Sequence, residues 1–67
     1  MNIYAETDYY IAKKIGRRLD QLRESRGMTR EELGAEMGIS QPTLRKFLDA
    51  GEGKFFYLIS ALRALQG

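Results

Sequence analysis

A short segment, residues 40–46, carries side chains whose hydrogen-bonding groups suit the edges of nucleic-acid bases. If this segment is helical, the period of 3.6 residues places Gln41, Pro42 and Arg45 on one face. A glutamine amide can bond adenine through two atoms and an arginine can bond guanine O6 and N7, each pair being worth about 1–3 kcal/mol of discrimination. The alternative is that these are ordinary polar residues of a helical surface, which serve only solubility.

Positive charge is concentrated just ahead of that segment. Residues 13–30 hold seven basic and two acidic side chains, whereas the rest of the chain holds four basic and seven acidic ones. The local balance is therefore +5 inside the cluster and −3 outside it, within an overall charge of +2. Such a cluster suits a polyanion, although a solvated helix face is the simpler explanation of any single run of charges.

Other kinds of chemistry find little support. The chain has no Cys and no His, which excludes disulfides, thiolate zinc sites and a histidine base. Its nearest approach to a carboxylate cluster is Glu31, Glu32 and Glu36, which helix capping and a solvent-facing helical surface explain. We therefore expect neither an enzyme nor a bound cofactor or metal.

The sequence also predicts the compartment. No apolar stretch approaches the roughly 20 residues of a membrane span, and residues 1–14 lack the basic-then-apolar order of a signal peptide. We expect a cytoplasmic, nucleoid-associated protein that does not contact a membrane.

Start and stop signals predict the elements that must position the segment 40–46. A first helix is expected from a cap at Thr7 to a stop at Gly27, and it has one buried face, made by Ile11, Ile15, Leu19 and Leu22. A second helix begins at a capping box formed by Thr29 and Glu32 and ends at Gly38.

The last two helices follow from the same signals. Ser40 caps a third helix that has Pro42 in its first turn and runs to about Leu48. A fourth helix is expected over about residues 54–65, with an apolar stripe of Phe55, Leu58, Ile59, Leu62 and Leu65. Residues 1–6 are either a disordered arm or a short strand across a dimer.

These elements predict the fold class and the domain organisation. The chain is expected to be all-α, a compact bundle of four or five helices that forms a single domain over residues 1–67, with residues 1–10 as an N-terminal extension. Only residues 38–40 separate the second and third helices. A turn this short makes the helices cross steeply, so that the second braces the third and holds one of its faces outward, as a reader of the DNA major groove requires.

Residues 15–65 resemble the phage-repressor and Cro-like (Xre-type) helix-turn-helix family, whose fold is lambda-repressor-like. The resemblance rests on apolar and small residues at the family's spacing: Leu33, Gly34, Met37, Gly38, Ile39, Leu44 and Phe47. The stretch Gly-Ile-Ser-Gln-Pro-Thr-Leu at residues 38–44 is similar to the family's Gly-Val-Ser-Gln-x-Thr-Ile. These residues build the helical core, so function must lie on the polar residues between them.

The resemblance implies a transcriptional regulator, in particular a repressor, that binds double-stranded DNA and reads the major groove with a helix at about residues 40–48. It implies base contacts at Gln41, Pro42, Thr43 and Arg45, with Pro42 offering only apolar contact. It implies phosphate contacts at Ser40, Arg30, Lys46, Arg17 and Lys54. Acidic residues in the loop 49–53 depart from the family pattern and do not favour phosphate contact there.

Partner proteins form a separate expectation. A domain of 67 residues is marginally stable alone, which favours a homodimer. Six of the seven aromatics lie toward the two ends of the chain: Tyr4, Tyr9, Tyr10, Phe55, Phe56 and Tyr57. They either fill the core, form a dimer contact or form a surface for a second protein. Because the last helix is broadly similar to that of helix-turn-helix antitoxins, the alternative function is an antitoxin or adaptor whose main partner is a toxin or another protein.

Overall fold

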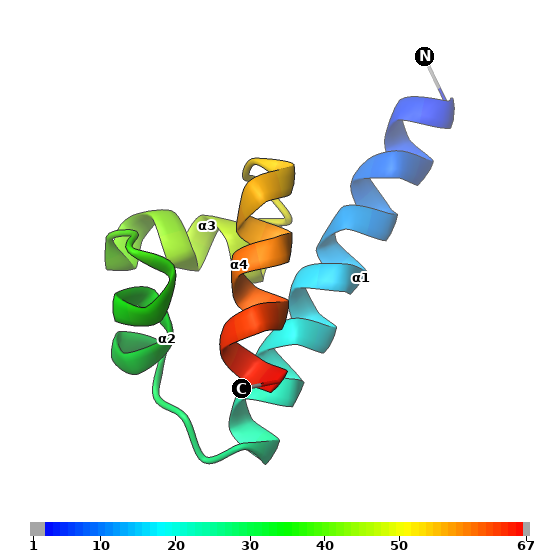
Figure 1. The fold of residues 1–67 in the computed structure, drawn as a ribbon. Coiled ribbons are helices and arrows are strands. Elements are labelled where there is room, and N and C mark those ends of the chain that lie inside the picture. Colours follow the sequence, from blue (N-terminus) through cyan, green and yellow to red (C-terminus); the bar gives the residue numbers. More distant parts are fainter. Residues whose placement is uncertain (1–2, 67) are drawn as a thin grey trace.

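Four helices make up the computed structural model, which describes residues 3–66 and the side chains from Glu6 onward. They are α1 (Ile3–Ser25), α2 (Arg30–Met37), α3 (Gln41–Ala50) and α4 (Phe55–Gln66). Figure 1 shows α4 in the middle of the molecule, with α1 on one side and α2 and the start of α3 on the other. The predicted all-α fold is confirmed, with four helices and no strand among residues 3–66.

The first helix starts earlier than the sequence predicted. It begins at Ile3 rather than after a cap at Thr7, so neither a disordered arm nor a strand describes residues 3–6; residues 1–2 lie outside the described part. The start signal at Thr7 is overridden because Ala5 and Glu6 favour helix and no Gly or Pro interrupts the segment. The N-terminal half of α1 consequently extends beyond the other helices (Figure 1).

Capping residues fix the ends of α2 as predicted. The Thr29 hydroxyl accepts the backbone N–H of Glu32 at 3.0 Å, and the Glu32 carboxylate accepts that of Thr29 at 2.9 Å. Gly38 ends the helix in the left-handed conformation, with φ of 71°. Helix α3 then begins three residues later, at Gln41, so the predicted tight connection between α2 and α3 is confirmed.

The core lies where α2, α3 and α4 meet the C-terminal half of α1. Leu33, Leu44 and Leu48 are its largest fully buried side chains, and Phe47 packs edge-to-face against Tyr57 with ring centroids 6.0 Å apart. Leu19 completes it from α1, and Ala61 and Leu65 from α4.

Two predicted apolar rows are only partly buried. In α1, Leu19 is buried and Leu22 half-buried, but Ile11 and Ile15 are exposed. They are exposed because Ala12 and Gly16, rather than these isoleucines, pack against the end of α3.

The predicted apolar row of α4 is also only partly buried. Ser60, Ala61 and Leu65 are buried, whereas Phe55, Ile59 and Leu62 are exposed. Periodicity identified the right helix, but α4 turns a face with small residues toward the core, where a short side chain permits close packing.

Glycine brings α1 and α3 into backbone contact. A Cβ on Gly16 would lie 2.6 Å and 2.7 Å from the carbonyl oxygens of Leu48 and Phe47. Beyond the end of α3, a Cβ on Gly51 would lie 2.5 Å from the carbonyl carbon of Ala12. The C-terminal end of α3 is thus held against the middle of α1, and the N-terminal end of α3 projects.

No helix among residues 3–66 has the length and hydropathy to cross a membrane.

Candidate nucleic-acid interface

The exposed start of α3 is built by its cap. The Ser40 hydroxyl accepts the backbone N–H of Thr43 at 3.3 Å and lies 2.9 Å from the Thr43 hydroxyl. Both hydroxyls, which the sequence predicted to contact phosphate and base, are therefore engaged with each other. Only one of the two O–H groups is used between them, so the other hydroxyl can still donate a hydrogen bond, as a contact to a phosphate oxygen requires.

The structure brings three of the predicted base-contacting residues together. Gln41, Pro42 and Arg45 are exposed and line one hollow. Arg30 and Glu31, from the first turn of α2, form the other wall of that hollow. We call this site the α2–α3 hollow. Thr43, which is half-buried, and Lys46, which is exposed, do not line it.

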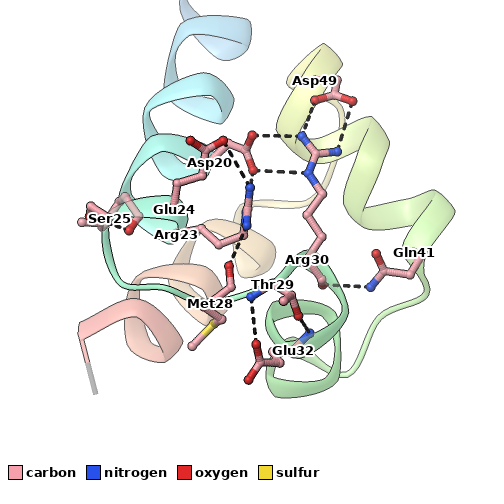
Figure 2. A network of polar contacts seen from close by, with 11 residues as sticks. Asp20, Arg23, Glu24, Ser25, Met28, Thr29, Arg30, Glu32, Gln41 and Asp49 are labelled. Carbon is pink, nitrogen blue, oxygen red and sulfur yellow. Dashed lines mark hydrogen bonds and ion pairs between the residues drawn. The ribbon is translucent and has the colours of Figure 1, made fainter.

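A hydrogen bond to the backbone orients Gln41. Its Nε2 donates to the carbonyl oxygen of Arg30 at 2.9 Å (Figure 2). This bond uses one of the two amide hydrogens and leaves the second N–H and Oε1 available. Gly34 makes room for the arrangement, since a Cβ there would lie 2.6 Å from Gln41 Nε2. Nothing in the sequence indicates the bond between Gln41 and Arg30.

Arg30 is held between two carboxylates. Its Nη2 lies 3.0 Å from Asp20 Oδ2 and 2.7 Å from Asp49 Oδ1. Its Nε and Nη1 make further bonds of 3.3 Å to the same two aspartates. Figure 2 shows the guanidinium between them, joining α1, α2 and α3. We call this trio the Asp20–Arg30–Asp49 clamp; no pattern in the sequence indicates it.

The clamp shifts the protonation equilibria of its members. Partial burial acts to raise the pKa of Asp20, but hydrogen bonds from Arg30 and Arg23 outweigh it and lower that pKa below the ordinary value. The hydrogen bond from Arg30 lowers the pKa of Asp49. Hydrogen bonds from Asp49 and then Asp20 raise the pKa of Arg30. All three groups are charged near neutral pH, which gives the clamp a net charge of −1.

Comparison with known families identifies the motif. A model described as a helix-turn-helix domain matches residues 14–66, most of the chain. The chain belongs to this helix-turn-helix domain family. The match supports DNA binding and covers α2, α3 and the α2–α3 hollow. Searches of curated proteins and of solved structures found no match.

The helix-turn-helix has fewer free cations than its sequence suggests. Like Arg30, Arg23 is engaged internally: it donates to Asp20 at 2.8 Å and to the carbonyl oxygen of Met28 at 2.6 Å. The other five basic residues of the cluster are exposed, and among the described residues none forms an ion pair: Lys13, Lys14, Arg17, Arg18 and Arg26.

Four side chains form a basic surface on the outer side of α1. Lys13 lies over the ring of Tyr9, 4.7 Å from its centroid, and Lys14 over that of Tyr10 at 5.9 Å. Tyr10, Lys13, Lys14 and Arg17 line a shallow hollow. Two tyrosines that the sequence offered as partner contacts therefore pair with lysines of their own helix; the side chain of Tyr4 lies outside the described residues.

Lys54 is placed apart from the other predicted phosphate contacts. It precedes α4 and lines a hollow between α1 and α4, together with Ile15 and Phe55. It does not line the α2–α3 hollow. The structure thus separates Lys54 from the predicted base-contacting residues.

Proposed function

We propose that this helix-turn-helix protein is a transcriptional repressor that binds double-stranded DNA sequence-specifically as a homodimer. The observation that carries the proposal is the α2–α3 hollow, where Gln41, Pro42 and Arg45 are exposed at the projecting start of α3. A helix presented in this way fits the major groove, where the edges of all four base pairs differ.

Gln41 is suited to read adenine. Its Oε1 can accept a hydrogen bond from adenine N6, and its remaining N–H can donate to N7. The bond to the Arg30 carbonyl holds the amide in one orientation before DNA arrives, which reduces the entropy lost on binding. In the same hollow, Arg45 supplies two parallel donors for guanine, and Pro42 an apolar contact for a thymine methyl group.

Phosphate contacts would fix the register of the helix on the duplex. We assign this role to Ser40, Lys46 and Arg17, of which Lys46 and Arg17 are exposed cations, and not to Lys54, which lines the hollow between α1 and α4. Arg30 donates four of its five N–H groups to the aspartates of the clamp, so it can offer a phosphate only one N–H unless an aspartate is released. Its main contribution is therefore to position α3 and the Gln41 amide.

The test is selection of duplexes from a random pool, followed by titration of the enriched sequence by fluorescence anisotropy. A palindromic sequence should be enriched and bound at least about 10³-fold more tightly than a scrambled duplex of equal length. Affinity should fall steeply with salt, because phosphate contacts release counterions. Absence of binding to any duplex at low salt, by protein with helical circular dichroism, would rule out the proposal.

The exposed aromatics of α4 support a second candidate function. Phe56 is 65% exposed and makes no ring contact among the described residues. An antitoxin or adaptor would use such a side chain to bind a second protein. Co-expression with the product of an adjacent gene, followed by co-purification of wild type and Phe56→Ala, distinguishes the two. Loss of a stable complex in the variant supports this function, whereas no complex with wild type excludes it for that gene product.

A further inference from the structure

An uncovered apolar surface runs across α1 and α4. Besides Phe56 and two tyrosines, five large apolar side chains on these helices are 37–74% exposed: Ile11, Ile15, Phe55, Ile59 and Leu62. We call this surface the α1–α4 face. Monomeric proteins expose single apolar side chains commonly, but a contiguous group marks an interaction site.

The five side chains belong to one surface. Ile11 and Ile15 lie on successive turns of α1, and Phe55 and Ile59 on successive turns of α4. Ile15 and Phe55 line the same hollow between the two helices, together with Ala12 and Leu58. Figure 1 shows α4 running alongside α1, so the two rows are neighbours.

The area of this surface suits a small protein interface. A fully exposed aromatic side chain presents about 200 Å² and the aliphatic ones less, so the exposed fractions amount to at most roughly 500 Å². Stable interfaces bury about 800 Å² on each partner and surround an apolar centre with a polar rim. Polar residues beside the apolar rows, such as Lys14, Arg18 and Gln66, are exposed and can supply that rim.

The α1–α4 face carries both a projection and a recess. Phe55, the most exposed of its side chains, lines a hollow together with the buried residues Gly16 and Phe47. In a two-fold dimer each copy offers the same patch, so a projection on one copy must meet a recess on the same face of the other. We propose that the occupant of the α1–α4 face is a second copy of this chain, packed about a two-fold axis.

This arrangement leaves the DNA-reading site free. Figure 1 places α2 and the start of α3 on the side of α4 away from α1. The α2–α3 hollow and the α1–α4 face share no lining residue. The inference rests on the dimer included in the proposed function, but its test contains no DNA, so dimerisation and DNA binding can fail independently.

Sedimentation equilibrium of the full chain, from micromolar to millimolar concentration, tests the inference with two matched variants. Phe55→Glu places a charge in the α1–α4 face and should raise the dimer dissociation constant by at least about 30-fold. Phe56→Glu changes the same residue type at the next position, which is 65% exposed and does not line the hollow, and should leave the constant within about threefold. Wild type that stays monomeric throughout, or equal constants for the two variants, overturns the inference.

A second measurement does not depend on a destabilising charge. The chain has no Cys, so Ile59→Cys and Phe56→Cys each introduce a single thiol. Alkylation of the thiol at position 59 should slow by at least about tenfold as the protein passes from monomer to dimer. Alkylation at position 56 should keep one rate. Equal behaviour of the two thiols would place the dimer contact elsewhere and overturn the assignment.

Discussion

The guanidinium of Arg30 lies 2.7 Å from the carboxylate of Asp49, which joins the first residue of α2 to the last turn of α3. The same guanidinium reaches Asp20 on α1, so three helices are tied through one side chain. The Arg30 carbonyl meanwhile orients Gln41. A residue that looks from sequence like a phosphate contact thus connects the helical frame to the proposed reading residue.

The first prediction concerns the charge of the Asp20–Arg30–Asp49 clamp. Asp49→Asn removes a negative charge beside the DNA-reading face and frees part of the Arg30 guanidinium for phosphate. Binding to scrambled duplex should tighten, and the plot of log affinity against log salt should steepen by about 0.9. The Asp49 side chain is 53% exposed, so the free energy of unfolding should fall by less than about 1 kcal/mol. Unchanged binding and slope would show that Arg30 stays committed to Asp20.

The second prediction concerns acid unfolding. The pKa values of Asp20 and Asp49 lie below their ordinary value of 3.8 because Arg30 bonds both carboxylates. A group with a lowered pKa stabilises the fold above its unfolded pKa and loses that contribution as the pH falls through the folded pKa. Thermal unfolding midpoints should therefore be steady above about pH 5 and fall below about pH 4.

Asn variants show which aspartate causes the fall of the unfolding midpoint at low pH. Asp20→Asn should lower the midpoint at pH 7 and flatten its fall below pH 4, when followed by circular dichroism. Asp49→Asn should have the smaller effect, because its side chain is 53% exposed against 18% for Asp20. Parallel curves for wild type and Asp20→Asn would exclude the clamp as the source of acid sensitivity.

Local signals were sufficient where a residue interacts with near neighbours. The capping box at Thr29, the cap at Ser40 and the stop at Gly38 are all present, because each depends on atoms within four residues. The Asp20–Arg30–Asp49 clamp spans 10 and 19 residues, and no spacing rule connects such positions. It follows from the packing of α1, α2 and α3, which a single sequence does not specify.

Periodicity was informative but incomplete. It identified α1 and α4 as helices, although α1 begins earlier than predicted, yet it could not indicate that Ile11 and Ile59 are exposed. For α3 the helical period did place Gln41, Pro42 and Arg45 together, and the structure brings them into one hollow. Whether these residues contact bases remains a prediction, because spacing determines position and not the ligand.

The third prediction concerns the contact of α1 with α3. Gly16→Ala should lower the free energy of unfolding by about 1–3 kcal/mol, since the new Cβ would meet backbone oxygens of Phe47 and Leu48 that cannot move alone. Gly34→Ala is the matched control, because its Cβ meets chiefly the flexible end of Gln41. That variant should be near neutral, helped by the better helix propensity of alanine. Urea unfolding measures both, and equal losses would contradict close backbone packing at Gly16.

The fourth prediction compares two neighbouring cations. Arg17 and Arg18 are both exposed on α1, but only Arg17 lines the shallow hollow of the basic surface, together with Lys13 and Lys14. Arg17→Ala should weaken binding to specific and scrambled duplexes alike and reduce the salt slope by about 0.9, as loss of one phosphate contact requires. Arg18→Ala should change the slope by less than half as much. Equal slopes for the two variants would assign their effect to net charge rather than to a contact at Arg17.

The last prediction separates base reading from phosphate contact. Gln41→Ala and Arg45→Ala should each reduce discrimination between the selected and scrambled duplexes by about 1–3 kcal/mol, because each removes a two-bond contact to a base edge. Lys46→Ala, on the same helix but outside the α2–α3 hollow, should weaken both duplexes equally. Competition titrations at fixed salt give the discrimination directly, and thermal melts check that α3 stays folded. If Gln41→Ala retains full discrimination, adenine is not read by this amide, and the bond to the Arg30 carbonyl serves only to hold α3 against α2.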